Sequence, residues 1–183
     1  MDMGENSMQV QILDPSTRRV SVWSGGKTEE WFLYPEDGSY AERRFLVRIS
    51  SATVESAESH FTPLPNVTRY LLPLCEGFYL KINGHWQFLP QHKVLKFSGS
   101  DDVLCRGRGR DLNLMLNGAH GDMRILEAGA TQVAPHAFLF LYCPEATRVD
   151  QSDVPADSFC RLLMNGFSPL SISKPSVLFT IDL

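Results

Sequence analysis

The chain lacks several features that would place it in a large class of proteins. No apolar stretch approaches the roughly 18 residues that a membrane-spanning helix needs, and no secretion-type segment opens the sequence. We therefore expect a soluble, cytoplasmic protein with no membrane partner. Its four cysteines are widely separated and form no Cys-x-x-Cys pair, so we expect reduced thiols that act as small buried residues.

Basic residues are too few for a general polyanion binder. The chain has 17 Lys and Arg against 21 Asp and Glu, for a net charge of −4. Phosphate backbones are held by clustered Lys and Arg, so nucleic acid is not an expected partner. The densest basic run, residues 106–110, alternates Arg with Gly and fits a turn into the next strand better than an RNA contact.

Signatures of metal, nucleotide and hydrolase sites are also missing. The five histidines never form a pair separated by one residue, a spacing that brings imidazoles together on one ion. Gly26-Lys27-Thr28 imitates the end of a phosphate-binding loop, but Ser21 stands where that loop needs glycine. No Gly-x-Ser-x-Gly elbow is present. We expect no metal, no cofactor and no catalytic residue that a motif would identify.

The sequence does contain strong signals for β structure. Asn-Gly dipeptides occur at residues 83–84, 117–118 and 165–166, and both residue types tolerate the positive φ of a tight hairpin turn. The clearest hairpin joins residues 78–82 to residues 85–89, with Ile82 opposite His85.

Short β-prone runs separated by turn residues continue along the chain, a pattern typical of an antiparallel sandwich or barrel. These further runs cover residues 31–34, 45–50, 69–74, 94–97, 112–116, 123–126, 137–142 and 177–181. A helical stripe in residues 52–60 is too short to predict a stable helix. Residues 143–157, rich in Pro, Asp and Ser, predict an exposed surface loop, with a linker as the alternative.

The length of 183 residues and the 43% hydrophobic content suit one compact unit with a full core, or two fused small ones. Asn-Gly dipeptides in both halves are compatible with two β lobes that are built alike. We expect a single unit over residues 1–183, with approximate lobes 1–100 and 101–183 that can exchange strands.

Two polar inserts interrupt otherwise apolar strands. Arg48 and Ser50 share one side of the first strand, and Asp111 and Asn113 share one side of the second, because side chains alternate across a strand. A buried charge survives only if it is paired and hydrogen-bonded. The inserts therefore mark either a structural polar network or a ligand pocket.

Several motifs, in their order along the chain, resemble the HutD/Ves family over roughly residues 10–145. The segments that carry the resemblance are Gly25-Gly26-Lys27-Thr28-Glu29-Glu30, Tyr34-Pro35, Val47-Arg48-Ile49-Ser50 with Ala52 and Val54, Phe61 with Leu64-Pro65-Asn66-Val67 and Arg69, and residues 110–115. The chain departs from the family pattern at Glu29, where Arg is usual, and at residues 56–60.

The resemblance implies an all-β, cupin-like double-stranded β-helix, doubled into a bicupin with little helix, in a bacterial cytoplasmic protein. Members of this family are often encoded with histidine-utilisation enzymes or named as stress-induced proteins. Together with the polar inserts, this context favours a non-enzymatic protein that binds a small organic acid and acts as a sensor or modulator of amino-acid catabolism.

Guanidinium groups bind carboxylates in a bidentate manner, so Arg48 and Arg69 are the expected anchors for a carboxylate metabolite. The full set of candidate ligand-binding residues is Arg48, Ser50, Arg69, Asp111, Asn113, Thr28, Glu30 and His60. The structural alternative is that Arg48 or Arg69 pairs with Asp111 or Glu30 and binds nothing.

Two further classes of function stay open at this point. A metal-independent isomerase or hydrolase would use Glu30, His60 or Asp111 as acid or base. A protein-interaction module would use exposed aromatic residues, for which Trp23, Trp31 and Trp86 are the candidates. Neither a monomer nor a homodimer is favoured.

Overall fold

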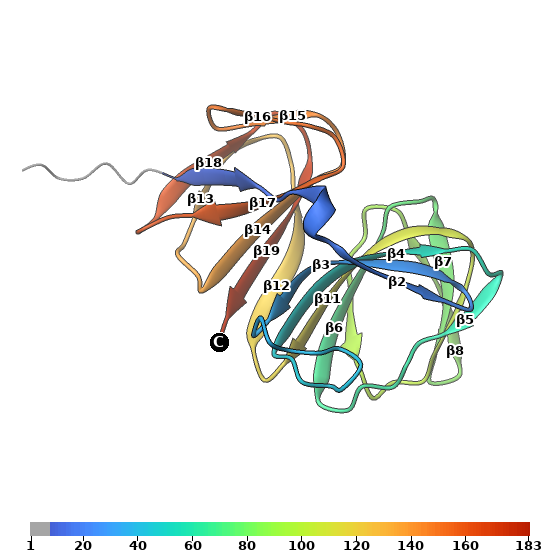
Figure 1. The fold of residues 1–183 in the computed structure, drawn as a ribbon. Coiled ribbons are helices and arrows are strands. Elements are labelled where there is room, and N and C mark those ends of the chain that lie inside the picture. The colour runs from blue at the N-terminus through green and yellow to red at the C-terminus, as the bar shows by residue number, and fades with distance from the viewer. Residues whose placement is uncertain (1–7) are drawn as a thin grey trace, which may run out of the picture. The chain divides into compact units, whose positions relative to one another are not determined.

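The computed structural model describes residues 8–183, which form antiparallel β-sheets and one short 3-10 helix (Figure 1). The chain divides into two compact units, residues 18–119 and residues 8–17 with 120–183. These bounds differ from the approximate lobes 1–100 and 101–183. The reason is pairing: β11 (Gly109–Asn117) bonds to β4 (Val47–Val54), and β1 (Gln9–Ile12) bonds to β17 (Ser158–Leu163).

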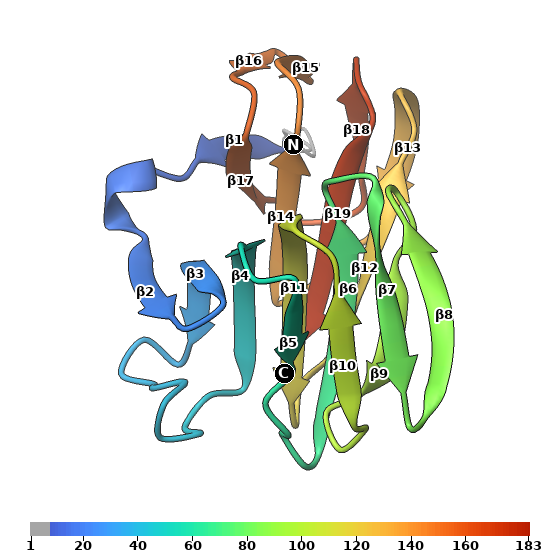
Figure 2. The same ribbon diagram turned by 90° about the vertical axis from the view of Figure 1, so that its right-hand side faces the viewer.

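The unit of residues 18–119 consists of two sheets that face each other (Figure 1). Apolar side chains of both sheets form one core cluster, with Leu71 and Phe97 from the larger sheet and Phe78, Leu80 and Val103 from the smaller one. The six-stranded sheet has the order β2 (Arg19–Trp23), β3 (Gly26–Tyr34), β4, β11, β6 (Val67–Pro73) and β9 (Leu95–Ser98). The four-stranded sheet, seen in Figure 2, has the order β5 (Glu58–His60), β10 (Val103–Arg106), β7 (Gly77–Ile82) and β8 (His85–Pro90).

The second unit also contains two sheets. Buried side chains from both of them, including Leu141, Cys160, Leu170 and Ile172, form its core. Its five-stranded sheet has the order β1, β17, β14 (Phe138–Cys143), β19 (Ser176–Asp182) and β12 (His120–Leu126). Its four-stranded sheet has the order β13 (Gly129–Val133), β18 (Ser168–Ile172), β15 (Thr147–Val149) and β16 (Ser152–Val154), and η1 spans Pro15–Thr17.

These sheets confirm the predicted all-β fold class, and every predicted strand run overlaps an observed strand. The β7–β8 hairpin has the expected register, with Ile82 opposite His85. Asn83 and Gly84 both have positive φ, at 48° and 89°, as a tight two-residue turn requires. Alternation along β7 buries Phe78 and exposes Tyr79.

The hairpins expected at residues 117–118 and 165–166 are wrong. β11 and β12 belong to different sheets, and so do β17 and β18. An Asn-Gly dipeptide favours a turn, but the partner of each flanking strand is decided by which sheet buries its apolar face. The Asn117 amide instead donates to the Phe45 carbonyl at 2.9 Å.

No helix forms over residues 52–60, in agreement with the prediction that this stripe is too short for a stable helix. Residues up to Val54 continue the ladders of β4, and residues 58–60 pair with β10. One further local expectation needs correction. Residues 143–157 are not a plain exposed loop. They contain β15 and β16, whose Thr147, Val149 and Val154 side chains are buried, so alternation within short polar strands was masked by the turn residues around them.

The four cysteines are free thiols, as expected, and all but Cys75 are buried. Burial raises the pKa of the Cys105 thiol to about 12, so this thiol is protonated and unreactive at neutral pH. Among the described residues, no helix is long and apolar enough to cross a bilayer.

Candidate functional site

A cavity of about 580 Å³ lies within the unit of residues 18–119, a size suited to a small metabolite. Seven of the eight predicted site residues line it: Thr28, Arg48, Ser50, His60, Arg69, Asp111 and Asn113. The eighth, Glu30, is not on the lining but bonds to Arg48. The two polar inserts therefore meet in one cavity, and the alternation of side chains accounts for the shared side within each insert.

Strand register explains why these residues share a wall. On β4 and β11, Ser50 lies opposite Asn113 and Arg48 lies opposite Met115. Met115 lies opposite Arg69 of β6 on its other side. The two arginines thus flank Met115 in one row across the sheet, two strand spacings or about 10 Å apart at the backbone.

Arg48 is a neutralised cation. Its Nε donates to Oε2 of Glu30 at 2.8 Å, and both side chains are at least 90% buried. The Tyr40 ring covers the guanidinium, with 4.0 Å between its carbon and the ring centroid. One of the two expected anchors therefore has its charge balanced within the chain, as the structural alternative anticipated.

Arg69 is buried without a carboxylate partner. Only 6% of it is exposed, and its Nη1 donates to the Thr62 carbonyl at 3.3 Å. Its guanidinium packs against the rings of Phe61 and Phe97, at 4.9 and 5.2 Å from their centroids. Within residues 8–183, no acidic group lies within ion-pair distance of it, and its buried Nε has no hydrogen-bond partner.

Burial lowers the pKa of Arg69 to about 10, because desolvation disfavours the charged form. The nearby positive charge of Arg48 acts in the same direction, whereas Asp111 opposes the shift. At neutral pH the side chain remains protonated. The cavity wall therefore holds a buried positive charge that ion pairing does not balance.

Asp111 is the buried acidic group of this wall, with 3% exposure. Its Oδ1 accepts hydrogen bonds from the Ala52 backbone N–H, at 3.3 Å, and from the Asn113 amide. Besides these two, no residue in the described part of the chain donates to the carboxylate, so Oδ2 remains available. Burial raises the pKa of Asp111 to about 7, although both hydrogen bonds and the charge of Arg69 lower it.

The remaining predicted residues have smaller roles in the geometry. The Thr28 hydroxyl accepts a hydrogen bond from Trp23 Nε1 at 3.2 Å, and Ser50 is 1% exposed. His60 lies at the exposed end of the lining on β5.

Sequence reasoning missed the aromatic part of the site. Tyr40 and Phe61, which cover the two guanidiniums, both lie outside strands. Residues in such segments follow no strand period, so no pattern identified Tyr40 or Phe61 as a site residue. The tryptophans proposed as exposed aromatics differ: Trp23 and Trp86 are 37% and 44% exposed, whereas Trp31 is half-buried beneath Arg18.

The donor set of the cavity does not fit a metal ion. Guanidinium groups do not ligate cations, and His60 and Asp111 are the imidazole and carboxylate on its lining. Across residues 8–183, no three His, Cys, Asp or Glu side chains gather closely enough to hold an ion. The arrangement suits an anion better than a cation.

Solved structures share this fold. HutD from Pseudomonas fluorescens SBW25 superposes with a TM-score of 0.80 at 19% identity, covering 95% of this chain and 98% of that one. A conserved protein of unknown function from Pseudomonas aeruginosa PAO1 superposes with a TM-score of 0.77 at 21% identity, and the match covers 96% of this chain and 100% of that one. A Bacillus subtilis oxalate decarboxylase variant gives 0.61 at 7% identity, covering 94% and 76%, so the fold is cupin-like.

No curated protein matches the chain. The sequence profile of the HutD family matches residues 16–164, which include both polar inserts and every residue of the cavity wall. This match confirms the resemblance seen in the sequence motifs. Because it spans most of the chain, the protein belongs to the HutD family.

Proposed function

We propose that this chain binds a small organic acid without transforming it, and that occupancy of the cavity makes it a cytoplasmic sensor or modulator of amino-acid catabolism, with histidine breakdown as the first pathway to test. One observation carries the proposal: Arg69 presents a buried guanidinium to a cavity of metabolite size without an ion-pair partner among the described residues.

The energetics support an acidic guest. An isolated buried charge is costly, and it is usually paired or hydrogen-bonded. In Arg69, one carbonyl and two aromatic rings replace the carboxylate that Arg48 has in Glu30. A guest carboxylate would provide that missing partner, and the planar guanidinium can hold both of its oxygens.

Titration calorimetry with the carboxylate intermediates of histidine breakdown tests the proposal. We expect a saturable heat for at least one of them in the wild-type protein. The Arg69→Met variant is expected to lose about 30-fold in affinity, which corresponds to about 2 kcal/mol for a charge-assisted hydrogen bond. Methionine fills similar space, and replacing an unpaired buried charge by an apolar group does not cost stability, so the variant is expected to fold.

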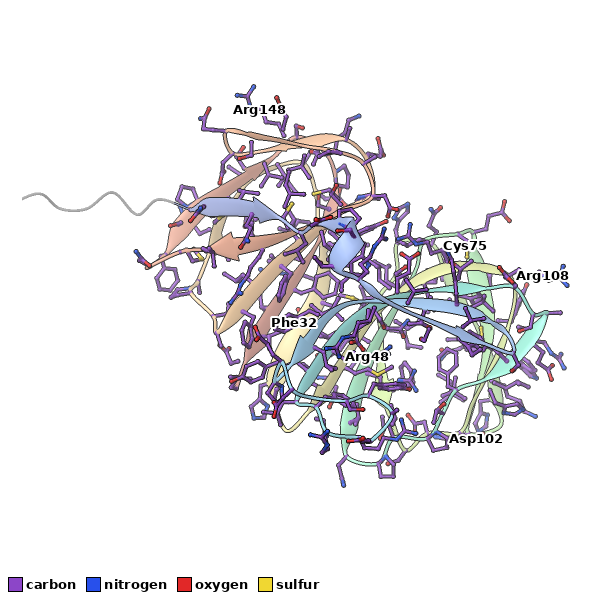
Figure 3. All side chains as sticks on the ribbon, in the orientation of Figure 1. Phe32, Arg48, Cys75, Asp102, Arg108 and Arg148 are labelled. Carbon is purple, nitrogen blue, oxygen red and sulfur yellow. The ribbon has the colours of Figure 1, made fainter. Side chains whose placement is uncertain are left out.

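Arg108→Met is the matched control. It removes the same charge from an exposed position that is not on the cavity lining and that lies far from Arg48 in Figure 3. Its affinity is expected to equal that of the wild type. The proposal would be refuted if the wild type gave no binding heat with any of the carboxylates, or if both variants lost affinity equally.

A second candidate function rests on Asp111. A carboxyl group with a pKa of about 7 on a cavity wall is suited to general acid–base chemistry at neutral pH. A metal-independent isomerase or hydrolase would convert one of the same carboxylates, and Asp111→Asn would abolish turnover while binding persists. Product analysis by NMR after long incubation with the wild-type protein is the test, and unchanged substrate would remove this candidate.

A further inference from the structure

Arg69 and Asp111 line the same cavity, yet they do not pair. Each is more than 90% buried, and neither lies within ion-pair distance of an opposite charge in the part of the chain that the structure describes. The two hydrogen bonds that Asp111 accepts end on Oδ1. The carboxyl group therefore has one oxygen, Oδ2, that can carry a proton without breaking either bond.

We propose that Asp111 is a second contact for the guest, and that the cavity takes up a carboxylate together with one proton. The proton resides on Oδ2 of Asp111, and this O–H group donates a hydrogen bond to the guest carboxylate. The inference rests on the proposed function, because it requires an acidic guest beside Arg69. The proton comes from solvent, and no covalent bond of the guest changes.

The electrostatics of the wall require this proton. A guest carboxylate attracted by Arg69 would add a second negative charge near Asp111, and two close carboxylates in a buried site do not both ionise. Protonation of Asp111 replaces that repulsion with a hydrogen bond. The neutral form is accessible near neutral pH because burial already raises the pKa of Asp111.

Most other groups around Asp111 are not suited to take up this proton on binding. Arg48 is balanced by Glu30, and the Arg69 guanidinium and the Cys105 thiol both stay protonated at neutral pH. The titratable and charged groups on the cavity lining, besides Asp111 itself, are Tyr40 and Arg43 between β3 and β4, Arg48 on β4, His60 on β5 and Arg69 on β6. Glu30 on β3 bonds to Arg48, and Cys105 on β10 and Arg110 on β11 interact electrostatically with Asp111. Histidine is a residue type that can change its charge near neutral pH, so His60 on the lining is the alternative proton acceptor that the experiment must separate from Asp111.

Calorimetry with formate, acetate and propionate tests the inference, because these three acids stay ionised above about pH 6. Above about pH 7, the affinity of the wild type is expected to fall about tenfold per pH unit, and below it the affinity is expected to level off. At about pH 8, titrations in two buffers of different ionisation enthalpy should show uptake of about one proton per guest bound.

Two variants assign the proton. Asp111→Asn keeps an oxygen for the hydrogen bonds from Ala52 and Asn113 and places an N–H₂ donor where Oδ2 was. This variant is expected to bind with pH-independent affinity, close to that of the wild type at low pH. His60→Gln is expected to keep the wild-type dependence of affinity on pH. The quantity compared among the variants is the slope of the logarithm of affinity against pH, and not the affinity at one pH.

The outcomes separate this inference from the proposed function. Saturable binding of a monocarboxylate with no proton uptake, or a wild-type slope in Asp111→Asn, would overturn the proton-coupled site and leave carboxylate binding intact. Loss of the pH dependence of affinity in His60→Gln would show that the imidazole takes up the proton, and would also overturn the inference about Asp111. If neither the monocarboxylates nor the histidine-pathway acids bind at any pH, the proposed function itself fails.

Discussion

Replacing Glu30 with alanine is expected to lower the free energy of unfolding by about 3 kcal/mol, measured by urea denaturation. The side chains of Glu30 and Arg48 are 10% and 6% exposed, and they are joined at 2.8 Å. Removing the carboxylate leaves the Arg48 guanidinium buried without its partner, and water cannot fully solvate it there. The cost arises from that unpaired charge and not from the lost attraction alone.

The exposed pair between Glu58 and Arg106 is the matched control. It has nearly the same geometry, with Nε of Arg106 2.7 Å from Oε2 of Glu58, but its side chains are 46% and 57% exposed. Glu58→Ala is expected to cost less than about 1 kcal/mol, because water replaces the lost partner. Adding Arg48→Met to Glu30→Ala should recover much of the lost stability. Equal losses in the two single variants would contradict this explanation.

Asp111→Asn is expected to change the pH dependence of stability. The pKa of Asp111 is about 7 in the folded chain and about 3.8 for an ordinary aspartate, so the folded state holds more protons between those values. The free energy of unfolding must therefore fall as pH rises from about 4 to about 7, by on the order of 3 kcal/mol for this group. The asparagine variant has no such titration.

Urea denaturation of both proteins without added carboxylate, at several pH values, measures this effect. The stability of the variant relative to the wild type should rise across that window and stay constant above about pH 8. Other titrating groups are common to both proteins and cancel in the difference. A difference that does not vary with pH would show that the Asp111 carboxyl titrates normally.

The sequence predicted which side chains share the wall of the site, but not which charged groups pair there. The two-residue period placed Arg48 with Ser50 and Asp111 with Asn113 on shared sides, and the register of β4 with β11 brings the pairs together. That period says nothing of which carboxylate reaches which guanidinium. Glu30 and Asp111 were both possible partners, and the structure shows that Glu30 takes Arg48 while Arg69 has neither.

Local turn signals predicted the chain path only where the flanking strands also pack together. At residues 83–84 the apolar sides of β7 and β8 face the same core, so the hairpin forms. At residues 117–118 the dipeptide is the same, but β11 is already paired on both sides, by β4 and β6. Pairing with strands that are distant in sequence outweighed the local preference for a hairpin turn, and a single sequence does not directly show which distant strands pair.

The position of β4 and β11 in the interior of their sheet has a kinetic consequence. Each strand is hydrogen-bonded along both edges, so moving Arg48, Asn113 or Asp111 would require breaking two ladders at once. Their amides should be among the slowest to exchange with deuterium. A wall this preorganised meets its guest without ordering any strand first, so selectivity among acids should be expressed mainly in their residence times.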